Sequence, residues 1–168
     1  GNDMVKSIDL VLDEIASEDA IAYIISEIPT NPRVEVPDMI ELKKVLAKKR
    51  KTKKNQLAVE PVFILDQTFC PNIRFTEKNE LLSLVKTISY VSGSKFPSGG
   101  LCTAGYCVAN QKAKELMEKI ETHIKLCDNE ANPLQVELLA KQLPSMNQRI
   151  QEAYNNTRQF VNFINIVL

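Results

Sequence analysis

The sequence lacks several features that mark whole classes of protein. Its 168 residues include one histidine, four cysteines and five glycines, a composition that excludes collagen, low-complexity disorder and a disulfide-dense miniprotein. The longest uninterrupted apolar run, Ala20 to Ile25, is far shorter than the ~20 residues that a membrane helix needs. We therefore expect one domain covering residues 1–168 and no membrane partner.

The common catalytic templates are also missing. There is no G-x-S-x-G elbow and no H-E-x-x-H pair. Cys102, Cys107, His123 and Cys127 have a spacing close to that of zinc fingers. If the segment 109–127 is one helix, however, Cys107 and His123 lie ~24 Å apart along its axis, too far for one zinc ion. We accordingly assign no catalytic residue, no metal ligand and no cofactor, which weighs against an enzyme.

The net charge of zero conceals a strong segregation of charge. Residues 1–42 contain ten acidic and two basic side chains, whereas residues 43–54 contain eight basic and no acidic ones. Such a basic run suits nuclear targeting or the phosphates of a nucleic acid, and its candidate residues are Lys48, Lys49, Arg50, Lys51, Lys53 and Lys54. Alternatively, residues 48–56 form a mobile, solvated segment that folds back near the acidic first 42 residues.

Hydrophobic periodicity predicts a mainly α-helical fold, a bundle of five to six helices. Apolar residues at helical spacing and capping residues give helices at 3–16, 17–28, 37–50, 76–92 and 108–127, followed by a long segment that begins at Asn132-Pro133 and is kinked at Pro144. We also expect a small β-hairpin near residues 57–75, with Pro61 restricting its strand to an edge.

The C-terminal segment has the most regular pattern. Nine positions alternate spacings of four and three, which is typical of a heptad seam in an antiparallel helix pair; they are Leu139, Leu143, Met146, Ile150, Ala153, Thr157, Phe160, Ile164 and Val167. Phe163 and Ile166 lie off this seam. We predict that they form an interface with a protein partner or a second copy of the chain.

Apart from Gly1, all glycines lie in residues 93–107. A glycine-rich loop before a helix can bind an anion through backbone N–H groups, and the candidate residues are Lys95, Ser98, Gly99, Gly100 and Thr103. An ordinary crossover loop is the other interpretation. Cys102 and Cys107 could form a bridge in an oxidising compartment, although we favour reduced thiols.

These patterns together predict a non-enzymatic helical module that binds protein partners. The alternatives are a nuclear or nucleic-acid-associated protein that uses residues 43–54, and a ligand-binding protein or enzyme that uses the loop 93–107. We expect a cytoplasmic or nuclear location. Secretion stays open, because Gly1 resembles a cloning remnant.

Overall fold

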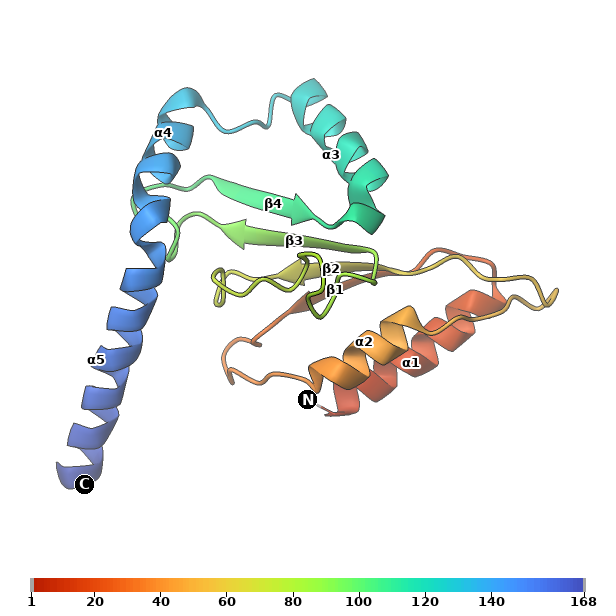
Figure 1. Cartoon of the computed structure of the whole chain (residues 1–168), viewed down its shortest axis with the longest axis horizontal. Helices are drawn as coiled ribbons and strands as arrows, with labels where there is room; N and C mark the ends of the chain where they lie inside the picture. The colour runs from red at the N-terminus through yellow and green to blue at the C-terminus, as the bar shows by residue number, and fades with distance from the viewer. Residues whose placement is uncertain (1, 168) are drawn as a thin grey trace. The chain divides into compact units, whose positions relative to one another are not determined.

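The computed structural model, which describes residues 2–167, contains a four-stranded mixed sheet with the strand order β1-β2-β3-β4 (Figure 1). The prediction of a helical bundle is therefore wrong. The chain divides into two compact units. The first consists of the residues up to Val91 together with Cys107–Glu130, and the second of Ser92–Tyr106 together with the residues from Ala131 onward.

Three strands of the sheet are parallel. β1 (Tyr23–Glu27) pairs with β2 (Val62–Asp66), and β2 pairs with β3 (Thr87–Ser92). β4 (Gly105–Ala109) runs beside β3 in the opposite direction (Figure 1). Parallel strands are covered on their faces and read as continuous apolar runs, without the alternation that reveals an exposed strand.

Two helix predictions are wrong. The apolar run Ala20 to Ile25 belongs to β1 and its approach, not to a helix over 17–28, and Ser17 ends the preceding helix. Likewise, the segment 76–92 is turns followed by β3, which is largely buried. A short apolar run fits a strand and a helix equally well, so periodicity alone did not distinguish them, and Tyr23 and Ile25 of the edge strand β1 are exposed.

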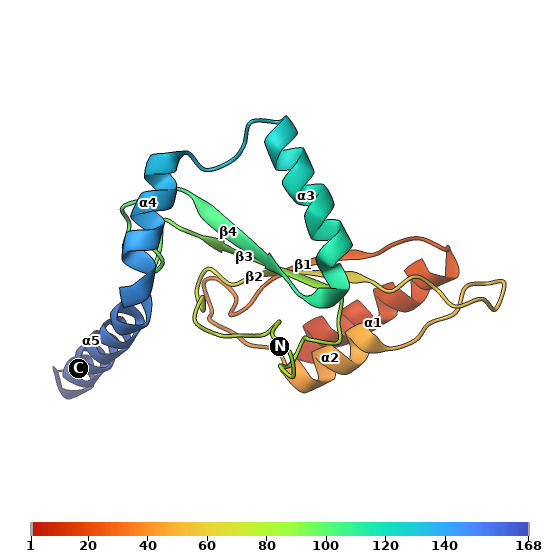
Figure 2. The same cartoon turned by 45° about the horizontal axis from the view of Figure 1, so that its top comes forward.

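The core of the first unit lies between the sheet and two helices. α1 (Asn2–Ser17) confirms the helix predicted over 3–16, and α2 (Met39–Ala47) lies beside it (Figures 1 and 2). Both pack on the face of β2 that contains Phe63 and Leu65, which are completely buried. The Asp38 side chain caps α2 by accepting hydrogen bonds from two backbone N–H groups.

The β-hairpin near residues 57–75 is also wrong. β2 is an internal strand, and both of its partners are parallel strands that are remote in the sequence. Pro61 directly precedes β2, where a missing N–H removes no ladder bond, so it does not restrict the strand to an edge. The helix predicted over 108–127 begins later, as α3 (Lys114–Leu126), because residues 105–109 form β4.

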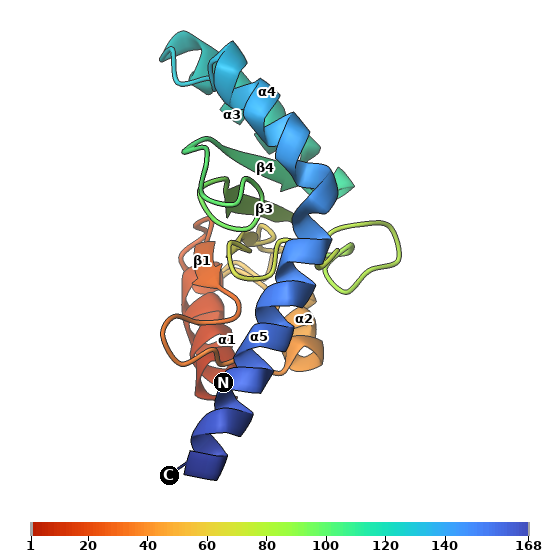
Figure 3. The ribbon, with the colours of Figure 1, turned by 90° about the vertical axis from the view of Figure 1, so that its left-hand side faces the viewer.

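The second unit confirms two local predictions. Asn132 caps α4 (Pro133–Gln142) in a reciprocal capping box with Gln135. A 3-10 turn, η2 (Leu143–Ser145), then contains Pro144 and joins α4 to α5 (Met146–Val167). Figure 3 shows α4 continuing through this turn into α5.

The predicted heptad seam does not bury α5. Every residue of this helix is exposed or half-exposed among residues 2–167, so the coiled-coil interpretation is wrong. Within the same part of the chain, no helix is both long and apolar enough to cross a membrane.

Candidate functional site

Polar side chains gather where the parallel strands of the first unit end. Asp66, the last residue of β2, is the register partner of Tyr90 on β3 and of Glu27 on β1. Register partners point to the same face of a sheet, so one phenol and two carboxylates share this edge. The carboxyl ends of parallel strands are where α/β sheets bind ligands.

The electrostatics of this edge are dominated by its carboxylates. Burial raises the pKa of Tyr90, and the negative charge of Asp66 raises it further. One oxygen of Asp66 accepts a hydrogen bond of 2.8 Å from the backbone N–H of Thr68, which fixes the carboxylate at the end of the strand. The site can therefore hold a positively charged or proton-donating group.

The opposite face of the same edge is a closed hydrogen-bond network. The buried Gln67 accepts a hydrogen bond from Ser89 and donates to the carbonyl oxygen of Ile73 at 2.9 Å. The Cys70 sulfur lies 3.0 Å from the carbonyl oxygen of Ile28, and burial raises the pKa of this thiol. These groups support the strand ends and leave Asp66 and Tyr90 on the other face.

In the second unit, the glycine-rich loop is a compact series of turns between β3 and β4. Gly93 packs so tightly that a Cβ atom there would lie 1.7 Å from the Ala104 carbonyl oxygen. Its own carbonyl oxygen accepts a hydrogen bond from the Ser98 N–H at 3.1 Å, and the Gly99 N–H donates to the Lys95 carbonyl oxygen at 2.9 Å. Gly93 is thus required by close approach.

Lys95 is the exposed cationic residue of this loop. Its backbone is held by the Gly99 N–H, but in the described part of the chain its ammonium group has no hydrogen-bond or ion-pair partner. Just before it, the hydroxyl oxygens of Ser92 and Ser94 lie 2.9 Å apart. One amine and two hydroxyls therefore occur within four consecutive residues of a rigid turn.

The other predicted loop residues have structural roles. Ser98 is fully buried, and its hydroxyl accepts a hydrogen bond of 3.0 Å from the Cys102 N–H. Thr103 accepts one from the side chain of Gln135. Gly99 and Gly100 have φ angles of +63° and +88°, which only glycine adopts without strain. Of the five predicted residues, Lys95 and Thr103 are exposed and have polar side chains, and Lys95 is the cationic one.

The basic segment lies against acidic residues of α1. Arg50, whose side chain is only 7% exposed, donates to Asp9 and, at 2.6 Å, to Asp13. Lys48 binds the same two carboxylates at 2.9 and 3.0 Å. The hydrogen bond from Lys48, followed by that from Arg50, lowers the pKa of Asp13. Of the two interpretations, the one that folds this segment back on the acidic region matches these contacts.

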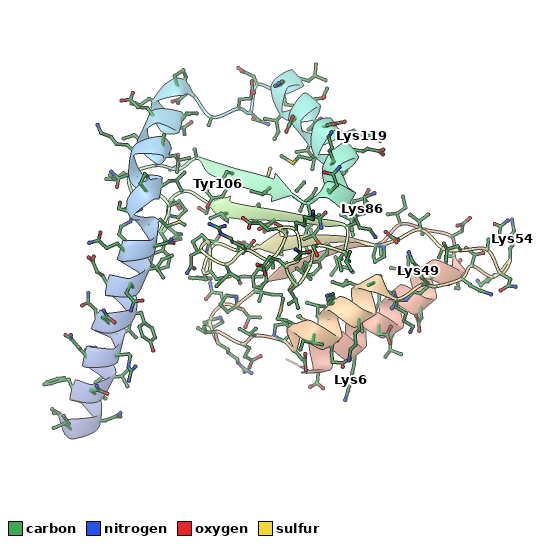
Figure 4. The ribbon with its side chains drawn as sticks, in the orientation of Figure 1. Lys6, Lys49, Lys54, Lys86, Tyr106 and Lys119 are labelled. Carbon is green, nitrogen blue, oxygen red and sulfur yellow. The ribbon has the colours of Figure 1, made fainter. Side chains whose placement is uncertain are left out.

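The remaining basic candidates have fewer contacts. Lys49 pairs with Glu60, Lys53 with Glu18, and Lys51 donates to the Asn55 side chain at 2.8 Å. Lys54 lies at the far tip of the loop (Figure 4). Most of the charge expected to meet phosphates is therefore neutralised within the chain.

The cysteines and the predicted interface residues form no site of their own among residues 2–167. All four cysteines are free thiols, and residues 2–167 contain no cluster of three or more metal-ligating side chains. Phe163 and Ile166 are 61% and 84% exposed on α5. Their role as an interface stays a prediction.

An open groove of about 290 Å³ lies between α1 and β1. Its lining is almost entirely apolar, with Ser7 and Tyr23 as the polar exceptions. Because few polar groups converge on it, the groove offers no chemistry comparable with that of the strand ends.

Comparison with known proteins identifies the fold. No family model matches the sequence, and no curated protein matches it. Similar solved structures include metB from Corynebacterium glutamicum (TM-score 0.68, 18% identity, 96% of this chain and 37% of that one). They also include a cystathionine gamma-lyase from Lactobacillus plantarum, complexed with L-serine (0.69, 23%, 95% and 38%). A third is CalE6, a methionine gamma lyase from Micromonospora echinospora (0.57, 20%, 74% and 30%).

These similarities establish the fold alone, and the chain spans less than two fifths of the length of these structures. They correct the predicted function, because the structures that share this fold are lyase enzymes and not non-enzymatic helical modules. Sequence reasoning missed Asp66 and Tyr90. The available signal was an aspartate directly after the buried apolar run of β2.

Proposed function

We propose that this chain is part of an enzyme that acts on an amino acid with pyridoxal phosphate, and that Lys95 holds this cofactor. The observation that supports the proposal best is the rigid turn after β3, which exposes the Lys95 amine directly after two serine hydroxyls. The similarity to gamma-lyase structures supports an amino-acid substrate, since one of them is complexed with L-serine.

The residues of the turn fit the chemistry of this cofactor. Pyridoxal phosphate has an aldehyde, which proteins bind through a lysine amine, and a phosphate, which accepts hydrogen bonds. Lys95 supplies the amine. The hydroxyls of Ser92 and Ser94 share one hydrogen bond of 2.9 Å, in which one O–H is the donor, and the pair would supply an O–H donor to a phosphate oxygen.

When bound, the cofactor acts as an electron sink for a carbanion next to the amino group of the substrate. The residues of this chain then have separate tasks. The Lys95 amine would hold the aldehyde carbon, with the aldehyde oxygen leaving as water, and once substrate displaces it the amine would accept or return a proton. The pair Ser92 and Ser94 would hold the phosphate.

The test is covalent mapping of the cofactor on the full chain. The protein is incubated with pyridoxal phosphate and reduced with borohydride, which fixes the cofactor to the lysine that holds it, and peptides are then mapped by mass spectrometry. We expect Lys95 to be labelled at least about tenfold faster than the exposed Lys141. Lys95→Arg should remove this label, and Lys141→Arg, the matched control, should not.

Even labelling of Lys95 and the other exposed lysines would overturn the proposal.

A further inference from the structure

Resting on the proposed function, we propose that Arg149 is the positioning residue that fixes the Lys95 turn in its reactive arrangement. Arg149 lies in the first turn of α5 and belongs to the same unit as the turn. It does not touch the Lys95 ammonium group. It binds the backbone of the two residues that follow Lys95.

The contacts are short and directional. One terminal nitrogen of Arg149 donates to the carbonyl oxygens of Phe96 at 2.6 Å and Pro97 at 2.9 Å. Its Nε donates to the same Phe96 oxygen at 3.2 Å. Hydrogen bonds from a charged group to carbonyl oxygens are stronger than neutral ones. The peptide groups directly after Lys95 are therefore held by a cation.

The guanidinium group is itself held in place by the kink between α4 and α5. It donates to the Ser145 hydroxyl at 2.5 Å and to the Gln142 carbonyl oxygen at 3.1 Å. Both partners lie at or next to η2, which contains Pro144. The kink predicted from the sequence thus sets the position of the arginine relative to the carbonyl groups that it binds.

The turn is constrained from its other end by glycine. The close approach of Gly93 to Ala104 fixes the chain before Lys95, and the Gly99 N–H binds the Lys95 carbonyl oxygen. Both sides of Lys95 are thus anchored, and its side chain is exposed. Because the Lys95 backbone is fixed, its amine has a higher effective concentration at one position. A displacement of a reacting group by ~1 Å can lower the reaction rate a hundredfold.

The experiment measures how fast pyridoxal phosphate labels Lys95, with Lys141 in the same digest as the internal reference. Arg149→Gln should lower the ratio of Lys95 to Lys141 labelling about tenfold. Arg149→Lys should recover part of it, because an ammonium group can still bind one carbonyl oxygen. Arg158→Gln is the matched control, since Arg158 lies on the same helix and its guanidinium group contacts Tyr154.

A purely structural role is tested with Asn132→Ala, which removes the cap of α4 without touching the turn. If Arg149→Gln lowers the labelling ratio no more than Asn132→Ala does, the inference is wrong. Ser145→Ala gives a second test, because it loosens the guanidinium but keeps its charge; a smaller fall in the ratio is expected.

The two proposals fail in different ways. If Lys95 in the unmodified chain is labelled no faster than Lys141, the proposed function is wrong. Amide exchange at Gly99, whose N–H binds the Lys95 carbonyl oxygen, still tests the inference in that case. Faster exchange in Arg149→Gln than in Arg158→Gln is expected, and equal rates would refute the anchoring role of Arg149.

Discussion

Two segments without regular secondary structure, the basic segment 48–56 and the loop 93–104, are fixed in different ways. In the basic segment, long side chains bind carboxylates of α1, and backbone hydrogen bonds such as that from the Thr52 N–H to the Gln56 carbonyl oxygen add to them. In the loop, backbone groups bind one another, and a single arginine side chain adds to them. The first arrangement pairs Lys48, Arg50 and Lys53 with carboxylates. The second leaves a lysine ammonium group available for chemistry.

The contrast shows why a dense run of charge is a weak sign of a binding site. Arg50 is almost completely buried against Asp9 and Asp13, so its charge is unavailable to a partner. A cluster of glycines is more informative, because it marks places where the backbone must approach closely or adopt a positive φ. In this chain the glycines surround the one lysine that we assign to chemistry.

The largest effect should come from adding a methyl group to the loop. Gly93→Ala places a Cβ 1.7 Å from a backbone oxygen, and we expect it to lower the free energy of unfolding by about 3 kcal/mol. Gly100→Ala meets no atom within 4 Å and adds only the strain of a φ of +88°, about 1 kcal/mol. Urea denaturation measures both, and equal losses would show that Gly93 is not confined as described.

In the basic segment, the loss of stability on removing a cationic side chain should depend on how deeply that side chain is buried, because each substitution removes the same charge. Arg50→Ala removes charge-assisted hydrogen bonds from a side chain that is 7% exposed, and we expect a loss of about 2 kcal/mol. Lys53→Ala removes an ion pair whose side chains are 69% and 62% exposed, and it should cost less than about 0.5 kcal/mol. If thermal melts show similar losses for the two variants, the segment is not anchored through Arg50.

A smaller effect should appear in the pH dependence of the free energy of unfolding. Hydrogen bonds from Lys112 and then Lys49 lower the pKa of Glu60 from 4.5 to about 2. A lowered pKa stabilises the fold above 4.5, and this contribution is lost as the pH falls towards 2. Because Glu60 is 39% exposed, solvent screening limits it to about 1 kcal/mol or less.

Glu60→Gln should accordingly destabilise the chain near neutral pH and have no effect near pH 2, as measured by urea denaturation at each pH. A constant difference between the variant and the unmodified chain across this range would contradict the assigned ion pairs with Lys49 and Lys112.

Local signals in the sequence were sufficient for several helices. The apolar spacing of α1, the capping box at Asn132 and the kink at Pro144 all depend on residues within a few positions of one another. Such features are decided locally, so a single sequence can reveal them.

The sheet depends on partners that the sequence does not place together. β1 pairs with a strand that begins 39 residues later, since Tyr23 is opposite Val62. Its apolar residues were equally compatible with a helix until that partner was known. The mistaken helix at β1 led to a second error. Because a helical bundle has no strand ends, the sequence analysis did not consider Asp66 as a site residue.

The candidate site was predicted only in part. The glycine cluster drew attention to Lys95, but Ser98 and Thr103 beside it proved to be structural. Nothing in the sequence linked Arg149 to this loop, since 53 positions separate it from Phe96. Contacts of that span follow from the fold and not from a local motif.

The hydrogen-bond capacity of Arg149 leads to one more conclusion. A guanidinium group has five N–H donors. In this chain its three nitrogens face the Phe96, Pro97 and Gln142 carbonyl oxygens, the Gln142 side chain and the Ser145 hydroxyl. Each nitrogen of the guanidinium group therefore has an acceptor within the protein itself. Under the proposed function, the carboxylate of an amino-acid substrate would need a different cation, because binding to Arg149 would break the contacts that hold the Lys95 turn.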